Sequence, residues 1–313
     1  MSAADSTTQT EMLPNQTVFR AYPQGVYTFS KPFNRFGIVP IGGRTTILKM
    51  RNDPNKNALF VIPSTPADDA TKAKVAEIVA ANGSSGPGVR FLAAPDFVHS
   101  MYLQEWSKAY PDALIVGVDG LQEKNPEVKS WHGIYGRDPP SKTRSYAFEP
   151  EIKAAYFPTF ANKDVVFFHE PSRTLLTADL IFNFPLKEQY ENTPHKRPTS
   201  WIPFLNSFST SMNPYKSIHQ SFLWGSGAGN PIPHSTAEEE VDGGKLSKEG
   251  GSTEERRQHF AKMASRVAGW DVGRIIMCHG EVIQDATEGD GTAKKAWISA
   301  FGKYLNPDGS VKI

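Results

Sequence analysis

The stretch Asp164-Val-Val-Phe-Phe-His-Glu-Pro-Ser-Arg-Thr-Leu-Leu-Thr-Ala-Asp179 decides the fold class. Its two runs of apolar and β-branched residues flank a Glu-Pro-Ser connection, which predicts a β-hairpin. The second run ends on Asp179, and strand ends of a rigid sheet are where layered folds place reactive groups. We therefore expect a sheet that carries chemistry at one edge.

Short strands and helices alternate on both sides of this hairpin. Apolar runs bounded by Gly, Pro, Asn or Asp predict strands, with antiparallel pairing for the first three, at 25–29, 45–50, 58–62, 89–94, 113–117 and 274–277. Apolar residues at helical spacing predict helices at 70–81, 101–109, from Thr253 onward and at 294–304. Strands and helices mixed in this order predict the α/β class, as a layered α+β sandwich.

Composition excludes several classes of protein. The 313 residues are 39% hydrophobic, which is enough for a sizeable core, and 34 Lys and Arg nearly balance 33 Asp and Glu. This balance gives no global field for nucleic acid or an anionic membrane, so the expected partner is a small molecule or another protein. The single cysteine, Cys278, allows no internal disulfide, and no signal peptide or apolar span is visible. We expect a soluble, cytoplasmic protein, with its oligomeric state open.

The amino-acid composition changes along the chain and predicts a tail, one domain and an insertion within that domain. Residues 1–15 are rich in Ser, Thr and Ala, which predicts an unstructured tail before one domain at 16–313. Within that domain, 186–252 is an insertion rich in Pro, Ser, Gly and Asn. Its aromatic first half is expected to dock on the core, and 236–252 is expected to be loosely held.

Potential metal ligands follow three of the buried strands. They are Asp96 and His99 after the strand at 89–94, Asp179 after the hairpin, and His279 after the strand at 274–277. Loops at one edge of a sandwich can bring such residues together, so we expect all four in one pocket.

The chain resembles a known family at these positions. The resemblance rests on Pro32-Phe-x-Arg-Phe-Gly, Ile41-Gly-Gly-Arg, Ala94-Pro-x-x-x-His, Glu105-Trp-x-x-x-Tyr-Pro and His169-x-x-Ser-x-Thr-Leu. Together they are similar to the DUF4336 branch of the metallo-β-lactamase superfamily, over roughly 18–185 and 254–304. The resemblance implies an αββα sandwich, with no counterpart for the insertion.

The resemblance also implies a reduced metal site. Hydrolases of the superfamily carry His-x-His-x-Asp-His, where this chain has Ala94, Asp96, Val98 and His99, and no histidine lies at 156–160. What remains is Asp96, His99, Asp179 and His279, a set that could hold one zinc, iron or manganese ion. Asp179 and His279 would then be the catalytic residues.

Two classes of function follow. One is a metal-dependent hydrolase of a small-molecule ester, lactone or thioester. The other is a non-catalytic protein that binds a ligand or a protein partner in a degenerate metal site.

Three further residues allow two interpretations each. His169 lines the same pocket or is hydrogen-bonded within the hairpin. Cys278 is a nucleophile paired with His279 or, as we favour, a small core residue. The stretch Gly42-Gly-Arg44 is either a close backbone approach to a ligand, with Arg44 as an anion clamp, or a tight hairpin turn with a surface arginine.

Overall fold

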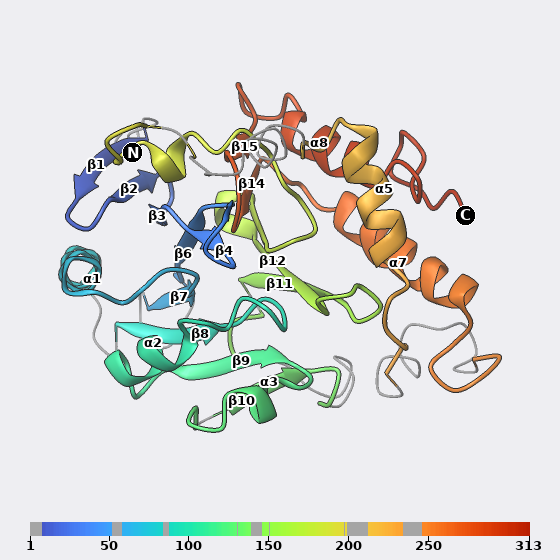
Figure 1. Ribbon diagram of the computed structural model, residues 1–313, viewed down its shortest axis with the longest axis horizontal. Coiled ribbons are helices and arrows are strands. Elements are labelled where there is room, and N and C mark those ends of the chain that lie inside the picture. The colour runs from blue at the N-terminus through green and yellow to red at the C-terminus, as the bar shows by residue number, and fades with distance from the viewer. Residues whose placement is uncertain are drawn as a thin grey trace.

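Two β-sheets face each other, with helices on both outer sides (Figure 1). The computed structural model describes residues 8–51, 58–83, 88–129, 131–138, 146–149, 151–196, 198, 212–233 and 246–313. The predicted layered α/β class is confirmed.

The first sheet is antiparallel in its first half and parallel in its second. In the described chain its strands lie in the order β1 (Gln9–Leu13), β2 (Thr17–Tyr22), β3 (Val26–Lys31), β6 (Gly43–Lys49), β7 (Leu59–Ile62), β8 (Val89–Ala93), β9 (Leu114–Val118) and β10 (Trp131–Tyr135). Pairing is antiparallel from β1 to β7 and parallel from β7 to β10. A small ribbon of β4 (Asn34–Arg35) and β5 (Val39–Pro40) lies between β3 and β6 in the chain.

The second sheet contains the predicted hairpin. Its order is β11 (Ile152–Phe157), β12 (Asp164–His169), β13 (Thr174–Thr177), β14 (Arg274–Met277) and β15 (Ile283–Gln284). β12 and β13 pair antiparallel across the short 3-10 turn η1 (Glu170–Ser172), which confirms the hairpin. β13 and β14 pair parallel, although 96 residues separate Thr177 from Arg274 in the chain.

Helices cover the outer face of each sheet (Figure 1). On the first sheet lie α1 (Asp69–Asn82), α2 (Leu103–Ala109) and α3 (Leu121–Lys124), and on the second α5 (Ser217–Ser226), α7 (Thr253–Ala268) and α8 (Thr292–Ala300). The predicted ends of two helices are confirmed: Gly83 ends α1 in the left-handed region, and Ser252 and Glu255 form a capping box on α7. None of the described helices is long and apolar enough to cross a membrane.

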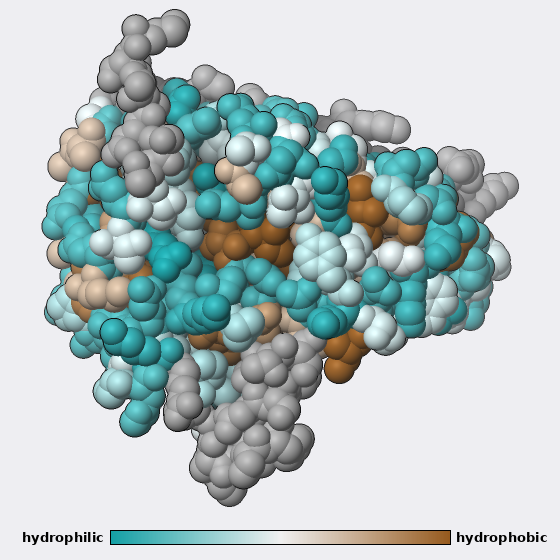
Figure 2. Space-filling model, turned by 90° about the horizontal axis from the view of Figure 1, so that it is seen from above, coloured by the Kyte–Doolittle hydropathy of each residue, from teal (hydrophilic) through white to brown (hydrophobic). Residues whose placement is uncertain are grey.

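Alternate residues of β12 fill two separate cores. Val165 and Phe167 pack between the two sheets, whereas Val166 and Phe168 pack under α7 and α8. Because successive strand residues point to opposite faces, a strand buried on both sides is apolar throughout. The outer surface is mostly hydrophilic in the view of Figure 2, with apolar side chains gathered in its recesses.

Part of the predicted tail is a strand. Residues 9–13 form β1, an edge strand with four of its five side chains exposed. Backbone hydrogen bonds to β2 hold it, so it needs no apolar pattern. Residues 1–7 lie outside the described residues.

The described parts of the 186–252 segment contact both sheets. The 3-10 turn η2 (Glu188–Tyr190) reaches the first sheet, and Phe222 and Trp224 of α5 pack against the core of the second. Three aromatic residues expected to dock, Trp201, Phe204 and Phe208, lie outside the described residues, as do 234–245. The prediction of a loose 236–252 is wrong at its end, where Gly251 is buried and Ser252 caps α7.

Candidate metal centre

Strand ends from both sheets place the candidate ligands at one edge of the sandwich. Asp96 and His99 follow β8 of the first sheet, while Asp179 and His279 follow β13 and β14 of the second. Thr177 is paired with Met277 in the parallel register. Asp179 and His279 lie two residues beyond this pair, so the register of the sheet sets their spacing.

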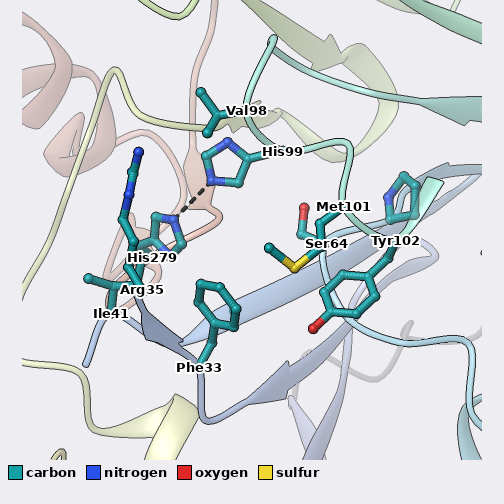
Figure 3. Close-up of a pocket in the computed structure, with 11 residues that line it drawn as sticks. Phe33, Arg35, Ile41, Ser64, Val98, His99, Met101, Tyr102 and His279 are labelled. Carbon is teal, nitrogen blue, oxygen red and sulfur yellow. Dashed lines mark hydrogen bonds between the residues drawn. The ribbon is translucent and has the colours of Figure 1, made fainter. Parts of the chain in front are cut away.

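Three of the four predicted residues form a compact group. One ligand atom each from His99, Asp179 and His279 lie within 4.8 Å of one another. The Nε2 atoms of the two histidines are 2.9 Å apart, and Asp179 Oδ1 is 3.8 Å from each of them. Figure 3 shows the two imidazoles facing each other.

Asp96 lies behind His99 instead of in this group. Its Oδ1 accepts hydrogen bonds from the backbone N–H of Val98 and His99, at 2.7 and 2.6 Å. Its Oδ2 is 2.7 Å from His99 Nδ1. Both carboxylate oxygens are thus engaged in holding the loop and the ring of His99.

Hydrogen bonds fix the tautomer of both histidines. His279 Nδ1 is 2.7 Å from the carbonyl oxygen of Gly42, which can only accept, so Nδ1 carries the proton. His99 Nδ1 faces the carboxylate of Asp96 and likewise donates. In the neutral rings both Nε2 atoms therefore direct lone pairs at each other, an arrangement that requires a proton or a metal ion between them.

The carboxylate of Asp179 has one free oxygen. Asn162 Nδ2 donates to Oδ2 at 2.6 Å, whereas Oδ1 is buried and accepts no hydrogen bond from the described residues. The backbone N–H of Asp179 donates to Asp164 Oδ2 at 3.0 Å. Two nitrogen lone pairs and an unpartnered carboxylate oxygen are a donor set that zinc, iron and manganese accept, so the residues fit a metal ion.

The protein's own charges make the site strongly polar. Burial alone would lower the pKa of His99, but the charges of Asp96 and Asp179 outweigh it and raise that pKa to about 9. Burial, with a smaller effect of His99, lowers the pKa of His279 to about 3. Burial raises the pKa of Asp179 to about 6. The pKa of Asp164 lies well above its usual range, because burial and the charges of Asp96 and Asp179 all raise it.

Remote segments hold the backbone around His279. Gln189 is fully buried, and its side-chain amide donates to the carbonyl of Cys278 at 2.8 Å and accepts from the N–H of Gly280 at 3.0 Å. Gly42 has a φ of +64°, and a Cβ atom there would lie 2.4 Å from Gln189 Oε1. Gly42 is thus needed both for its conformation and for the space that Gln189 fills.

Neither interpretation of Arg44 is correct. Its side chain is fully buried and forms an ion pair with Glu188 at 3.2 Å, and its Nη1 donates to the carbonyl of Met277 at 2.7 Å. Arg20 also pairs with Glu188, at 3.1 Å. The charge of Arg44 is thus used to attach the 188–190 turn to the first sheet.

His169 and Cys278, the two other residues with two interpretations, are both buried. His169 is buried at the far end of β12 from Asp164, where Nδ1 contacts Ser172 Oγ at 2.7 Å within the hairpin turn. Cys278 is buried, and burial raises the pKa of its thiol, which agrees with a core residue.

Two cavities border the candidate metal centre. A cavity of about 90 Å³ lies beside His99 and His279, under residues that include Phe33, Met101 and Tyr102 (Figure 3). A cavity of about 280 Å³ reaches Asp179 and His279 and is lined by aromatic side chains of 160–222. Both are mainly apolar, which suits the body of a small organic ligand.

Several residues of the site were not among those predicted from sequence. Asn162, Asp164, Gly42 and Gln189 each hold a candidate ligand or its backbone. Asp164 could have been noticed as a carboxylate at the start of an apolar strand. Gly42 acts through its carbonyl, which leaves no side-chain signal.

Solved structures of similar fold are metallo-β-lactamases. The enzyme from Erythrobacter litoralis is 11% identical, covers 92% of this chain and 96% of its own, and has a TM-score of 0.52. Those from Hirschia baltica (9% identical, 95% and 99% covered) and Pseudomonas aeruginosa (FIM-1, mono-zinc form, 9% identical, 91% and 93% covered) have TM-scores of 0.49. The likeness to the Erythrobacter litoralis enzyme, together with the two facing sheets and their outer helices, shows the metallo-β-lactamase fold and confirms the predicted αββα sandwich.

The similarity to known proteins concerns the fold alone. No protein-family model and no curated protein matches the chain. The resemblance to DUF4336 thus stays a prediction.

Proposed function

We propose that this protein is a hydrolase with one divalent metal ion that cleaves an ester, lactone or thioester of a small molecule. The observation that supports this most is the convergence of His99 Nε2, His279 Nε2 and the unpartnered Asp179 Oδ1 between two apolar cavities. When bound, a divalent metal would polarise a substrate carbonyl and make water more acidic.

The chain's own residues would supply the rest of the reaction. His99, His279 and Asp179 would hold the ion, while Asp96 and the Gly42 carbonyl keep the rings in the correct tautomer. Asp179 would also orient the attacking water, because Asn162 fixes its other oxygen. The apolar cavity walls would exclude bulk water and bind the substrate body.

The alternative is a ligand-binding protein without catalysis. It is favoured by the 2.9 Å contact between the two Nε2 atoms, which one proton on His99 could satisfy. In that case the predicted ligands form a buried hydrogen-bonded cluster beneath a binding cleft.

Metal content distinguishes the two functions. Protein purified without chelator and then incubated with zinc, iron or manganese should retain close to one equivalent, and His279→Ala should lose both the metal and turnover of ester and lactone substrates. His195→Ala is the matched control, because His195 is exposed and lies outside the group. Wild-type protein with less than about a tenth of an equivalent would establish the ligand-binding alternative.

A further inference from the structure

Arg35 lies where the two cavities meet. Of all the lining residues, only Arg35, Ile41 and His279 border both cavities. Figure 3 shows the Arg35 side chain extended beside His279 towards the level of Val98 and His99. The guanidinium is thus at the mouth of the metal centre, on the β4–β5 ribbon.

The charge of Arg35 has no ion-pair partner among the residues that the structure describes. Its guanidinium carbon lies 5.3 Å from the ring centroid of the neighbouring Phe36, a cation–π contact. Arg44, nine positions further on, is by contrast paired and buried. Arg35 acts electrostatically on His99 and Asp179, which places its charge close to the reacting centre.

The rest of the cavity lining offers little to neutralise this charge. Asp179 is the one carboxylate among the lining residues of either cavity, and it is assigned to the metal. With a divalent cation bound, the charges of the cation and Arg35 would exceed those of Asp96 and Asp179 by one. An anionic ligand would restore neutrality.

We propose that Arg35 is a specificity-determining residue that selects substrates carrying a carboxylate in addition to the scissile ester or lactone group. The proposal rests on the proposed function. A carboxylate fits better than a phosphate dianion, because one guanidinium matches one charge and forms two parallel hydrogen bonds with a planar carboxylate. The apolar parts of the substrate would then occupy the two cavities on either side.

The test compares 4-acetoxybenzoate with its methyl ester, which differ in one negative charge. The metal-loaded wild type should prefer the carboxylate in kcat/KM by about tenfold or more, as one charge-assisted hydrogen bond allows. Arg35→Gln should remove this preference, Arg35→Lys should keep part of it, and Arg35→Glu should reverse it. Lys72→Gln, which removes an exposed charge on α1, should leave it unchanged.

A binding measurement separates this proposal from the proposed function. Benzoate should bind the wild type and lose at least about tenfold in affinity in Arg35→Gln, by calorimetry with and without metal, while metal content stays the same. If the wild type binds no metal but benzoate affinity still depends on Arg35, the hydrolase is wrong and the carboxylate site stands. Equal affinity of wild type and Arg35→Gln for benzoate would overturn the carboxylate site, whatever the metal content.

Discussion

The two histidines of the candidate metal centre have their Nε2 atoms 2.9 Å apart, but different parts of the chain hold them. His99 is held by Asp96, three residues earlier in the same loop. His279 is held by the Gly42 carbonyl, 237 positions away, and its neighbouring backbone by Gln189 and Arg44. The His99 support is local, whereas the His279 support exists only when both sheets and the 188–190 turn are assembled. Substitutions distant from the site should therefore affect His279 far more than His99.

The largest effect should come from Glu188→Gln, which breaks the buried contact between the 188–190 turn and the first sheet. It leaves Arg44 buried without its ion pair, so the free energy of unfolding at pH 7 should fall by about 3–5 kcal/mol. Glu191→Gln, which removes a half-buried ion pair with Arg20 at the edge of the cluster, should cost under about 1 kcal/mol in the same denaturant experiment.

The loss of stability in Glu188→Gln should depend on pH. Burial opposes ionisation of Glu188, but Arg44 and Arg20 bring its pKa below the ordinary value of 4.5. Its contribution to stability is thus complete above pH 4.5 and is lost as the pH falls through the folded-state pKa. The difference between wild type and Glu188→Gln should shrink below pH 4.5. A constant difference from pH 7 to pH 3 would contradict the role given to this charge.

The next effect should come from Gly42→Ala, which acts directly on the acceptor of His279. The added Cβ would be strained at φ +64° and would collide with Gln189, so a loss of about 2–4 kcal/mol is expected, together with weaker metal binding. Gly83→Ala is the matched control, because Gly83 has a φ of +62° but open space around its Cβ position. Equal losses in the two variants would mean that the fit to Gln189 is unimportant.

A smaller effect, confined to metal binding, should follow from Asp96→Asn. The amide cannot enforce the donor tautomer of His99 as a carboxylate does, so metal affinity should fall about 10- to 100-fold in a competitive chelator titration. Asp271→Asn, at an exposed ion pair with Arg173, should leave affinity unchanged. Unchanged affinity in Asp96→Asn would remove Asp96 from the site.

The smallest effect should come from Ser30→Ala. The hydroxyl donates to Glu188 Oε1 at 2.6 Å and accepts from Arg44 Nε at 3.0 Å, and its loss should cost about 1–2 kcal/mol in thermal or denaturant unfolding. Metal affinity should not change, because the Arg44 contact to Met277 is retained. Loss of metal in this variant would show that the His279 support is more cooperative than these contacts suggest.

The sequence predicted Asp96 and His99 as ligands of one site, but it predicted neither the support that Asp96 gives to His99 nor the remote support of His279. Asp96 and His99 lie three residues apart after an apolar run, and such runs also marked the strands before Asp179 and His279. No sequence pattern relates Gly42 or Gln189 to His279, because a backbone carbonyl has no identity and an amide carries no charge. The edge strand β1 was missed for a related reason: backbone pairing with β2 defines it, and four of its five side chains are exposed.

The parallel pairing of β13 with β14 has a consequence for how this chain can vary. Thr177 and Met277 are paired across these strands, and Asp179 and His279 lie two residues beyond them. The distance between Asp179 and His279 therefore does not depend on the length of the chain that connects the two strands. Loop-closure entropy rises only by about 0.6 kcal/mol for each doubling of a connection, so added length costs little chain entropy as long as α5 and α7 keep their packing on the second sheet. Residues of this connection that line the larger cavity, such as Met212 and Phe222, can thus change while the spacing of Asp179 and His279 stays the same.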